Sequence, residues 1–303
     1  MNHGYTYEAV LAASEKVKWR VEDLIGGERR LDFSKPFLPE SLARVEELAF
    51  LTVEERRLLN QIRGHGYLYT FVLVEEFILP FVLDHARPQL HGESDRVRAL
   101  LGFAQEEAKH IDLFKRFRAA FLRGFETPCE AIGPPAEIAR HVLSHHPLAV
   151  ALTILHVEWM TQRHYLDSVR GDEGLDPRFK SLLKHHWMEE AQHARLDTLM
   201  VEALADAGGA REIDAAVEQY LAIGGFLDEG LKQQAAFDLA SLERAAGRAL
   251  SEAERAVFLE RQRQALRWTF LGSGMTHGSF LATVGALSPA ARARVEAVAA
   301  NLC

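Results

Sequence analysis

The chain has 303 residues, of which 48% are hydrophobic and 26% charged, and its formal net charge is −8. This is ordinary globular usage, and a negative balance without a basic cluster argues against nucleic acid as a partner. Because Cys129 and Cys303 are the only cysteines, a disulfide framework is excluded and a reducing compartment is expected.

The first 50 residues carry scattered aromatic residues and prolines, among them Trp19, Phe37 and Pro39. This composition predicts a packed irregular arm rather than a separate domain. The first residues lack the basic-then-apolar pattern of a signal peptide, so we expect a cytoplasmic protein.

The first long helix is predicted to begin at Thr52, because Thr52 and Glu55 have the spacing of a capping box. Within it, residues 67–83 are almost unbrokenly apolar apart from one threonine and the adjacent Glu75 and Glu76. The run is nearly long enough to span a bilayer, but its two carboxylates favour a buried core helix and no membrane span. Burying an unpaired polar group costs about 2–7 kcal/mol and a charge costs more, so a carboxylate here needs a partner such as a metal ion.

Two adjacent carboxylates compete for that role. At about 100° per residue, with Arg56, Asn60 and Arg63 taken as the solvated face near zero, Glu76 falls about 200° round the helix and Glu75 about 100°. We therefore predict Glu76 as the metal ligand. Pro80 leaves the Glu76 carbonyl without its usual partner and is expected to kink or bulge the helix. The alternative, Glu75, lies 83 residues before Glu158, and the same offset separates the two motifs described next.

One pentapeptide occurs twice, as Glu-Glu-Ala-Lys-His at 106–110 and Glu-Glu-Ala-Gln-His at 189–193. Each copy holds a Glu-x-x-His pair, and residues three apart on a helix project from the same face. Each copy therefore offers a carboxylate and an imidazole to one metal ion. The paired residues are Glu107 with His110 and Glu190 with His193. The glutamate that opens each copy, Glu106 or Glu189, is predicted to be a solvated residue or a supporting neighbour of the ligands.

The second half of this region repeats the plan of the first. Glu158 lies in an apolar stretch, residues 148–160, and precedes Glu190 by 32 residues; Glu76 precedes Glu107 by 31. Each half therefore reads as a helix, a connection and a returning helix. Two Glu-x-x-His helices, with one glutamate from each of two others, form the ligand set of a dinuclear metal centre in a four-helix bundle.

Helix boundaries follow from the positions of capping residues, prolines and glycines. Ser94 or Asp95 is expected to cap the second helix, Pro147 and Pro177 suit the first turns of the third and fourth, and Gly208-Gly209 ends the bundle. Further helices are predicted over 211–246, 251–271 and 289–301. The glycine-rich residues 272–287 are predicted to form a plain turn between helices, with a loop or a broken helix near the substrate entrance as the alternative, and His277 is not predicted to be a ligand.

His186 is a seventh candidate ligand. It stands four residues before Glu190 and seven before His193, and such positions fall within about 60° on one helical face. The alternative for His186 is a core histidine that donates to a carboxylate. His185 points about 100° away and is expected to lie at the surface or to support a ligand.

The spacing His186-x-x-x-Glu190-x-x-His193 resembles that of the p-aminobenzoate N-oxygenase family, di-iron enzymes that oxidise arylamines and carry an added histidine. The resemblance covers residues 55–207. It implies an all-α, ferritin-like four-helix bundle with a dinuclear metal centre and the activity of an O2-dependent monooxygenase. By that resemblance the seven metal ligands are Glu76, Glu107, His110, Glu158, His186, Glu190 and His193.

We predict that Glu107 and Glu190 bridge the two ions and carry the catalysis. The expected cofactor is a pair of iron ions, with manganese as the alternative metal, and O2 is the expected co-substrate. The expected partners are a small-molecule substrate and an external electron donor; a homodimer is left open.

Two other function classes use the same core ligands. One is an oxygenase, desaturase or aldehyde-processing enzyme acting on an acyl chain. The other is a ferroxidase-type ferritin-like protein, which is disfavoured by the length of the chain and by the absence of a Cys-x-x-Cys pair. Fold alone does not separate these classes, because function depends on the pocket.

The whole chain, 1–303, is predicted to be a single ferritin-like domain. It divides into an N-terminal arm (1–50), a metal-binding four-helix core (52–207) and a C-terminal helical extension (210–303). Asp112 and Arg195, just past the two motif histidines, are candidates to orient ligands, with ordinary ion pairs as an equal alternative. Side chains on the metal-bearing helices that could wall the site, although core packing explains most of them, are Phe71, Val72, Leu79, Phe103, Phe114, Ile154, Trp159 and Trp187.

Overall fold

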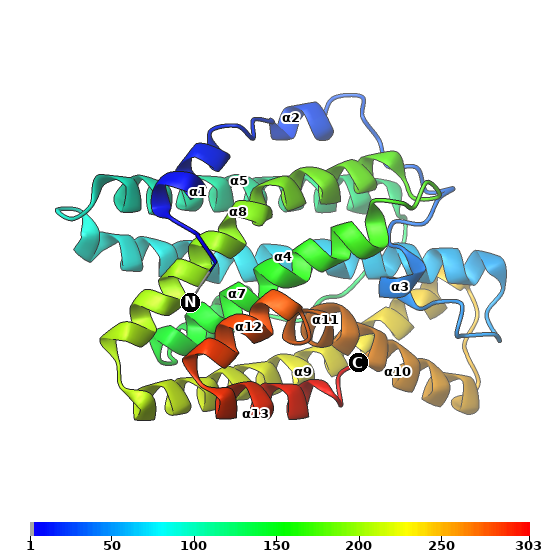
Figure 1. The fold of residues 1–303 in the computed structure, drawn as a ribbon. Coiled ribbons are helices and arrows are strands. Elements are labelled where there is room, and N and C mark those ends of the chain that lie inside the picture. Colours follow the sequence, from blue (N-terminus) through cyan, green and yellow to red (C-terminus); the bar gives the residue numbers. More distant parts are fainter. Residues whose placement is uncertain (1–2) are drawn as a thin grey trace.

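The computed structural model describes residues 3–303, and this part of the chain is helical almost throughout (Figure 1). Within it there is no β-strand, only an isolated bridge between Gly26 and Arg29. The four central helices are α4 (Val53–Ala86), α5 (Ser94–Gly124), α7 (Pro147–Arg163) and α8 (Pro177–Ala207). The all-α prediction is confirmed.

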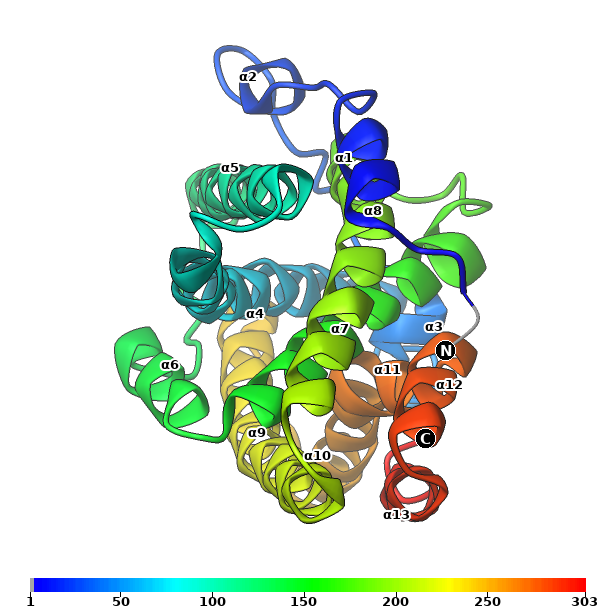
Figure 2. The same ribbon diagram turned by 60° about the vertical axis from the view of Figure 1, so that its left-hand side comes forward.

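The central helices form two hairpins that pack against each other (Figure 2). α4 pairs with α5 through the short turn η1 (Arg87–Gln89), and α7 pairs with α8 through a π-helical turn, η2 (His164–Val169). The connection between the hairpins contains α6 (Pro135–Leu143), which packs against α4. This arrangement is the ferritin-like four-helix bundle that the repeated motif predicts.

The helix starts agree with the sequence in most cases. Thr52 Oγ1 accepts the Glu55 N–H at 3.2 Å and the Glu55 carboxylate accepts the Thr52 N–H at 2.8 Å, so the capping box is confirmed. Pro147 and Pro177 occupy first-turn positions as expected. The predicted cap of the second helix is wrong, because α5 begins after Glu93 and its N-cap makes no side-chain hydrogen bond.

Helix α4 is the central core element. It runs through Pro80 as a single helix and packs against α5, α6 and α9 (Ala210–Ala246). By length and composition the segment Val53–Gln89 could cross a membrane, but 67% of its most apolar 18-residue window is buried inside the protein. It therefore has the burial of a core helix.

The N-terminal arm contains three short helices: α1 (Tyr7–Ser14), α2 (Val21–Leu24) and α3 (Glu40–Ala43). α1 and α2 lie over α5 and α8, as Figure 1 shows along the upper edge of the molecule. Phe37 is fully buried and stacks on Phe179 of α8 with ring centroids 5.1 Å apart. The arm is packed against the bundle, as the sequence predicts.

The C-terminal region adds a further helical layer. α9 packs against α7 and α4, and α10 packs against α9. The elements of this region are α9 (Ala210–Ala246), α10 (Glu252–Arg267), a π-helical turn η3 (Trp268–Gly272), α11 (Ser273–Met275), α12 (Gly278–Leu287) and α13 (Pro289–Ala299).

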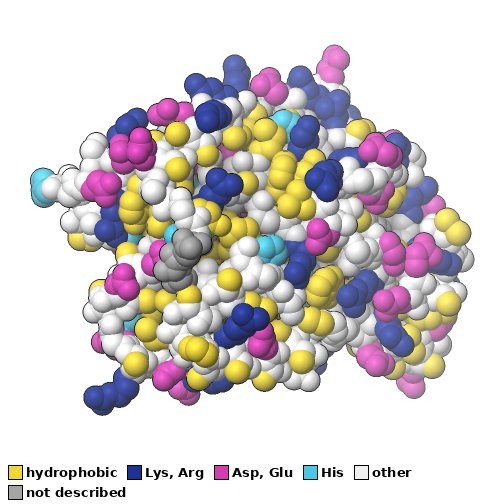
Figure 3. All heavy atoms as spheres, viewed as in Figure 1, with side chains coloured by type: hydrophobic (Ala, Val, Ile, Leu, Met, Phe, Trp, Pro, Cys, Tyr) yellow, Lys and Arg dark blue, Asp and Glu magenta, His cyan; other side chains and the backbone are white. Residues whose placement is uncertain are grey.

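The glycine-rich residues 272–287 are mostly helical, with a break between α11 and α12. The plain turn predicted there is therefore wrong, and the alternative of a broken helix is confirmed. Gly274 packs directly against the ring and carbonyl of His156, where a β-carbon would not fit. His277 caps α12 by accepting the Ser279 N–H at 3.2 Å. Gly274 therefore serves close packing rather than a loop. On the face shown in Figure 3, basic and acidic side chains are interspersed.

Candidate metal centre

Side chains from four helices converge inside the bundle to form a buried cluster. α4 provides a glutamate, α5 provides one Glu-x-x-His pair, α7 provides a second single glutamate, and α8 provides the other pair and an added histidine. All are at most 2% exposed. The members of this cluster are Glu75, Glu107, His110, Glu158, His186, Glu190 and His193.

The structure places Glu75 in the cluster and leaves Glu76 outside it. Glu75 is 2% exposed and its Oε1 lies 3.2 Å from His186 Nε2. The Glu76 side chain is 31% exposed and pairs with Lys115 at 2.7 Å. The choice of Glu76 is therefore wrong, and the 83-residue offset is the better guide.

The helical-wheel argument failed because its reference face is not solvated. Asn60 and Arg63 are buried under the N-terminal arm and α9. Asn60 Oδ1 accepts the Phe37 N–H at 2.7 Å, and Arg63 lies 3.9 Å from Asp238 of α9. Polar residues on this face of α4 bind the N-terminal arm and α9 instead of water, so polarity alone does not mark the solvated face.

The ligand atoms form two overlapping groups, each with atoms within 4.8 Å of one another. We call them position 1 and position 2. Position 1 consists of Glu75, His110, His186 and Glu190. Position 2 consists of Glu107, His110, Glu190 and His193. His110 belongs to both groups, but its Nδ1 lies 3.1 Å from Glu190 Oε1, the oxygen that also faces His186, so we assign its imidazole to position 1.

Glu190 and Glu107 each span the two positions. Glu190 Oε1 lies 3.1 Å from His110 Nδ1 and 2.5 Å from His186 Nε2, whereas its Oε2 lies 2.7 Å from His193 Nδ1. Glu107 Oε1 lies 3.0 Å from His193 Nδ1, and its Oε2 lies 3.6 Å from His110 Nδ1. One oxygen of each carboxylate thus faces each position, which is the geometry that a bridging ligand needs.

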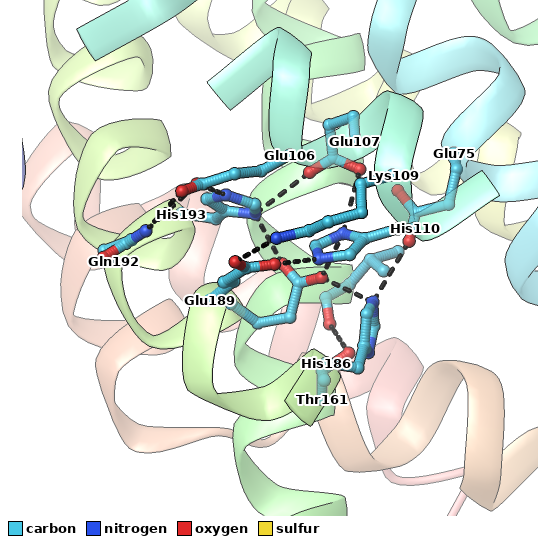
Figure 4. Close-up of polar contacts among 12 residues, drawn as sticks. Glu75, Glu106, Glu107, Lys109, His110, Thr161, His186, Glu189, Gln192 and His193 are labelled. Carbon is cyan, nitrogen blue, oxygen red and sulfur yellow. Dashed lines mark hydrogen bonds and ion pairs between the residues drawn. The ribbon is translucent and has the colours of Figure 1, made fainter. Parts of the chain in front are cut away.

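The outer nitrogens of two histidines are held by the glutamates that open the motif copies (Figure 4). His110 Nε2 lies 2.9 Å from Glu189 Oε2, and His193 Nε2 lies 2.8 Å from Glu106 Oε2. An ionised carboxylate only accepts, so both Nε2 atoms carry the proton and both Nδ1 atoms direct a lone pair into the cluster when it holds metal. Each copy of the motif therefore orients the histidine of the other copy.

The buried carboxylates have strongly shifted pKa values without metal. Burial, followed by the charge of Glu107, raises the pKa of Glu75 well above its usual range. Burial, followed by the charge of Glu190, does the same to the pKa of Glu158. Burial also acts on Glu190, but His186, His193 and other cluster groups outweigh it and hold the Glu190 pKa well below its usual range.

The imidazoles are shifted in different directions. Burial opposes the charged form of His110 and His193, but the negative charge of Glu190 prevails and raises the pKa of both well above the usual value. Burial prevails at His186 and lowers its pKa. In the absence of metal, protons on two imidazoles therefore balance part of the negative charge of the carboxylates.

Several polar atoms of the cluster have no hydrogen-bond partner within residues 3–303. A buried polar atom without a partner costs about 1–3 kcal/mol, and more when it is charged. Oxygen and imidazole donors of this kind suit iron or manganese. The residues present therefore fit two metal ions. The unpartnered atoms are Glu75 Oε2, both Glu107 carboxylate oxygens, His110 Nδ1, Glu158 Oε2 and Glu190 Oε1.

The structure adds one residue that sequence reasoning missed. Asp197 is fully buried, and neither carboxylate oxygen has a hydrogen-bond partner in the described part of the chain. Burial raises its pKa well above the usual value, against the charge of His193. The available signal was its place four residues after His193, which puts it on the same helical face.

Two residues proposed to orient ligands do other things. Asp112 pairs with Arg116 at 2.9 Å, and the Arg195 guanidinium lies over the Tyr5 ring, 5.8 Å from its centroid. His185 turns away from the cluster as predicted, and its Nδ1 lies 2.7 Å from the Ser181 carbonyl oxygen.

Phenylalanines wall the cluster on two sides. Phe71 and Phe114 meet the His186 ring edge-on, with centroids 5.1 and 4.8 Å away. The ring centroids of Phe103 and His193 are 4.3 Å apart. Trp159 and Trp187 stack instead on His277 and Tyr165.

The fold and the cluster together define a ferritin-like protein with a dinuclear, carboxylate-rich metal site. No protein-family model and no curated protein matches the sequence.

Among solved structures, the chain is similar to an R2-like ligand-binding oxidase variant with an anaerobically reconstituted Mn/Fe cofactor, at 15% identity and a TM-score of 0.48, covering 89% of this chain and 94% of that one. A second variant of that oxidase, with an aerobically reconstituted Fe/Fe cofactor, gives 14% identity and a TM-score of 0.47 over 88% and 93% of the two chains. At this distance no activity, substrate or metal carries over to this chain.

Proposed function

We propose that the protein is a di-iron, O2-dependent monooxygenase that oxidises a small organic substrate, with N-oxygenation of an amine as the favoured reaction. The observation that carries the proposal is the place of His186. Its imidazole is 1% exposed, and its Nε2 lies between Glu75 and Glu190 in position 1. An added histidine of this spacing is the feature that resembles the p-aminobenzoate N-oxygenases.

When bound, two ferrous ions would supply electrons for the reduction of O2. Glu75, His110 and His186 would hold the ion in position 1, and His193 with Glu158 would hold the ion in position 2. Glu107 and Glu190 would contribute to both, since each directs one oxygen to each position.

The protein contributes orientation and exclusion of water. Glu189 and Glu106 keep the Nδ1 lone pairs of His110 and His193 directed inward. Phe71 and Phe114 beside His186, and Phe103 beside His193, are buried apolar rings that keep bulk water from an oxidising site on these sides. An external electron donor in the cytoplasm completes the proposed cycle by returning the metal pair to the ferrous state.

The test is product analysis with iron-loaded protein. Anaerobic protein carrying two Fe(II) per chain would be mixed with O2 and a chemical reductant in the presence of arylamines or, separately, fatty aldehydes. We expect hydroxylamine or nitro products from the amine panel. Oxidation of aldehydes alone would support the carbon-oxidising class, and iron oxidation without any organic product would support the ferroxidase class.

A further inference from the structure

The two motif copies differ at one position, which is Lys109 in the first copy and Gln192 in the second. The residue before each histidine reaches the same outer carboxylate as the histidine itself. Lys109 Nζ forms an ion pair with Glu189, which also accepts from His110. Gln192 Nε2 lies 3.0 Å from Glu106 Oε2, which also accepts from His193. The geometry is reciprocal, but one donor is charged and the other is neutral.

This difference changes the charge behind each histidine. Glu189 shares its negative charge with a lysine, so it is a weaker acceptor for the His110 N–H. Among residues 3–303, the donors to Glu106 besides His193 are neutral: Gln192, and Ser14 of α1 at 2.6 Å. Because an outer carboxylate raises the basicity of a ligand histidine, His193 is the stronger donor to a metal ion.

The side chains that face the two metal positions also differ, and in the same direction. Position 1 has two imidazoles, His110 and His186, and Glu75 as its own carboxylate. Position 2 has one imidazole of its own, with Glu158 and Asp197 buried beside it. Once metal ions displace the protons of these carboxyls, position 2 offers one more carboxylate and one fewer imidazole than position 1. Lys109 adds a positive charge on the side of position 1.

We propose that Lys109 makes the two metal positions unequal, so that a divalent cation fills position 2 first and position 1 second with weaker affinity. Lys109 acts through Glu189 and His110 and is thus a positioning residue. The inference rests on the dinuclear centre of the proposed function, but it requires no oxidation reaction.

The N-terminal arm fixes Lys109 in this role. Its ammonium group lies over the Trp19 ring, 4.1 Å from the centroid. A hollow of about 570 Å³ between the arm and helices α5 and α8 reaches Glu106, Lys109 and Glu189. The Lys109 side chain is 25% exposed, so water screens part of its charge. We therefore expect an effect near 10-fold, the lower end of the 10–100-fold range for groups that support a ligand.

The experiment is an anaerobic titration of full-length, metal-free protein with Mn(II), in which unbound ion is counted by its electron paramagnetic resonance signal. The wild type should bind two ions with dissociation constants at least about 10-fold apart. Lys109→Gln should tighten the second step by about 10-fold and leave the first unchanged, whereas Lys109→Arg, which keeps the charge, should resemble the wild type. Gln192→Lys should weaken the first step. Lys115→Gln removes a cation from the same helix that pairs with Glu76 instead, and should change neither step.

Crystals grown with one equivalent of Mn(II) identify the position filled, from its anomalous scattering. Density at position 2 in the wild type, shared between positions in Lys109→Gln, supports the proposal. Three results would overturn the proposal while leaving the dinuclear centre intact. They are equal dissociation constants for the two steps in the wild type, occupancy of position 1 before position 2, and a second step that Lys109→Arg tightens as much as Lys109→Gln does. Failure of the wild type to bind Mn(II) or Fe(II) would sink the dinuclear centre and this inference together.

Discussion

The adjacent pair Glu75 and Glu76 offers a matched test of the cluster, because one substitution removes a ligand and the other a surface charge. Without metal, burial raises the Glu75 pKa and keeps the carboxyl neutral, so Glu75→Gln replaces one neutral group by another of similar shape. The metal-free variant should therefore be about as stable as the wild type. Glu76→Gln removes an ion pair whose side chains are 31% and 54% exposed, a contact worth about 0–1 kcal/mol.

The effect should appear when metal is added. At a free metal concentration of about 1,000 times the dissociation constant, binding stabilises the wild type by about 4 kcal/mol. Loss of Glu75 should weaken metal binding at position 1 by at least about 100-fold, which is the upper limit for groups that only support a ligand. Metal binding then stabilises the variant by only about 1.4 kcal/mol. For a chain of this size the difference is about 5 °C in Tm.

Differential scanning calorimetry with and without Mn(II), together with elemental analysis, measures both quantities. The Glu76→Gln variant should keep the full metal-dependent rise in Tm and its metal content. If Glu76→Gln lost the rise and Glu75→Gln kept it, the placement of the first helix in the cluster would be refuted, whatever the activity.

Three further predictions concern the cluster and the core. Glu107→Ala or Glu190→Ala should lower iron from about two ions per chain to below one by elemental analysis, since each carboxylate faces both positions; two ions retained would contradict bridging. His186→Ala should still bind some iron but change the optical spectrum after O2 exposure and lose substrate oxidation, and an unchanged spectrum and turnover would reduce His186 to a core residue. Burial, with the charge of Arg118, lowers the His65 pKa to about 3. Because an unfolded histidine titrates near 6.5, the free energy of unfolding should fall by about 1.4 kcal/mol per pH unit as pH drops from about 6.5 towards 3; His65→Gln should flatten this slope in urea titrations, and an equal slope would contradict the burial effect.

The fold was predictable because its signals are local. Thr52 with Glu55, Pro147 and Pro177 set helix starts through contacts within one turn, and these were found. The short helices at residues 273–287 are not favoured by the sequence, because glycines such as Gly274 signal a turn by themselves. Their packing role at Gly274 depends on His156, which is more than 100 residues away in the sequence.

The metal ligands show the same contrast between local signals and contacts with distant segments. Glu107, His110, Glu190 and His193 follow from an i,i+3 spacing that any helix enforces. The choice between Glu75 and Glu76 depended on which face of α4 is covered by the arm and by α9. Nothing in the helix itself carries that information, so the wheel was read from residues that are buried by distant segments.

The crossed support between the motif copies has a consequence for assembly. His110 on α5 is oriented by Glu189 on α8, and His193 on α8 is oriented by Glu106 on α5. Neither helix can present its histidine correctly until the two hairpins have packed, although each motif is complete in sequence. Packing alone brings buried carboxylates together and raises their energy, whereas metal ions relieve it. Metal binding should therefore be coupled to the docking of one hairpin on the other, and each hairpin alone should bind metal poorly.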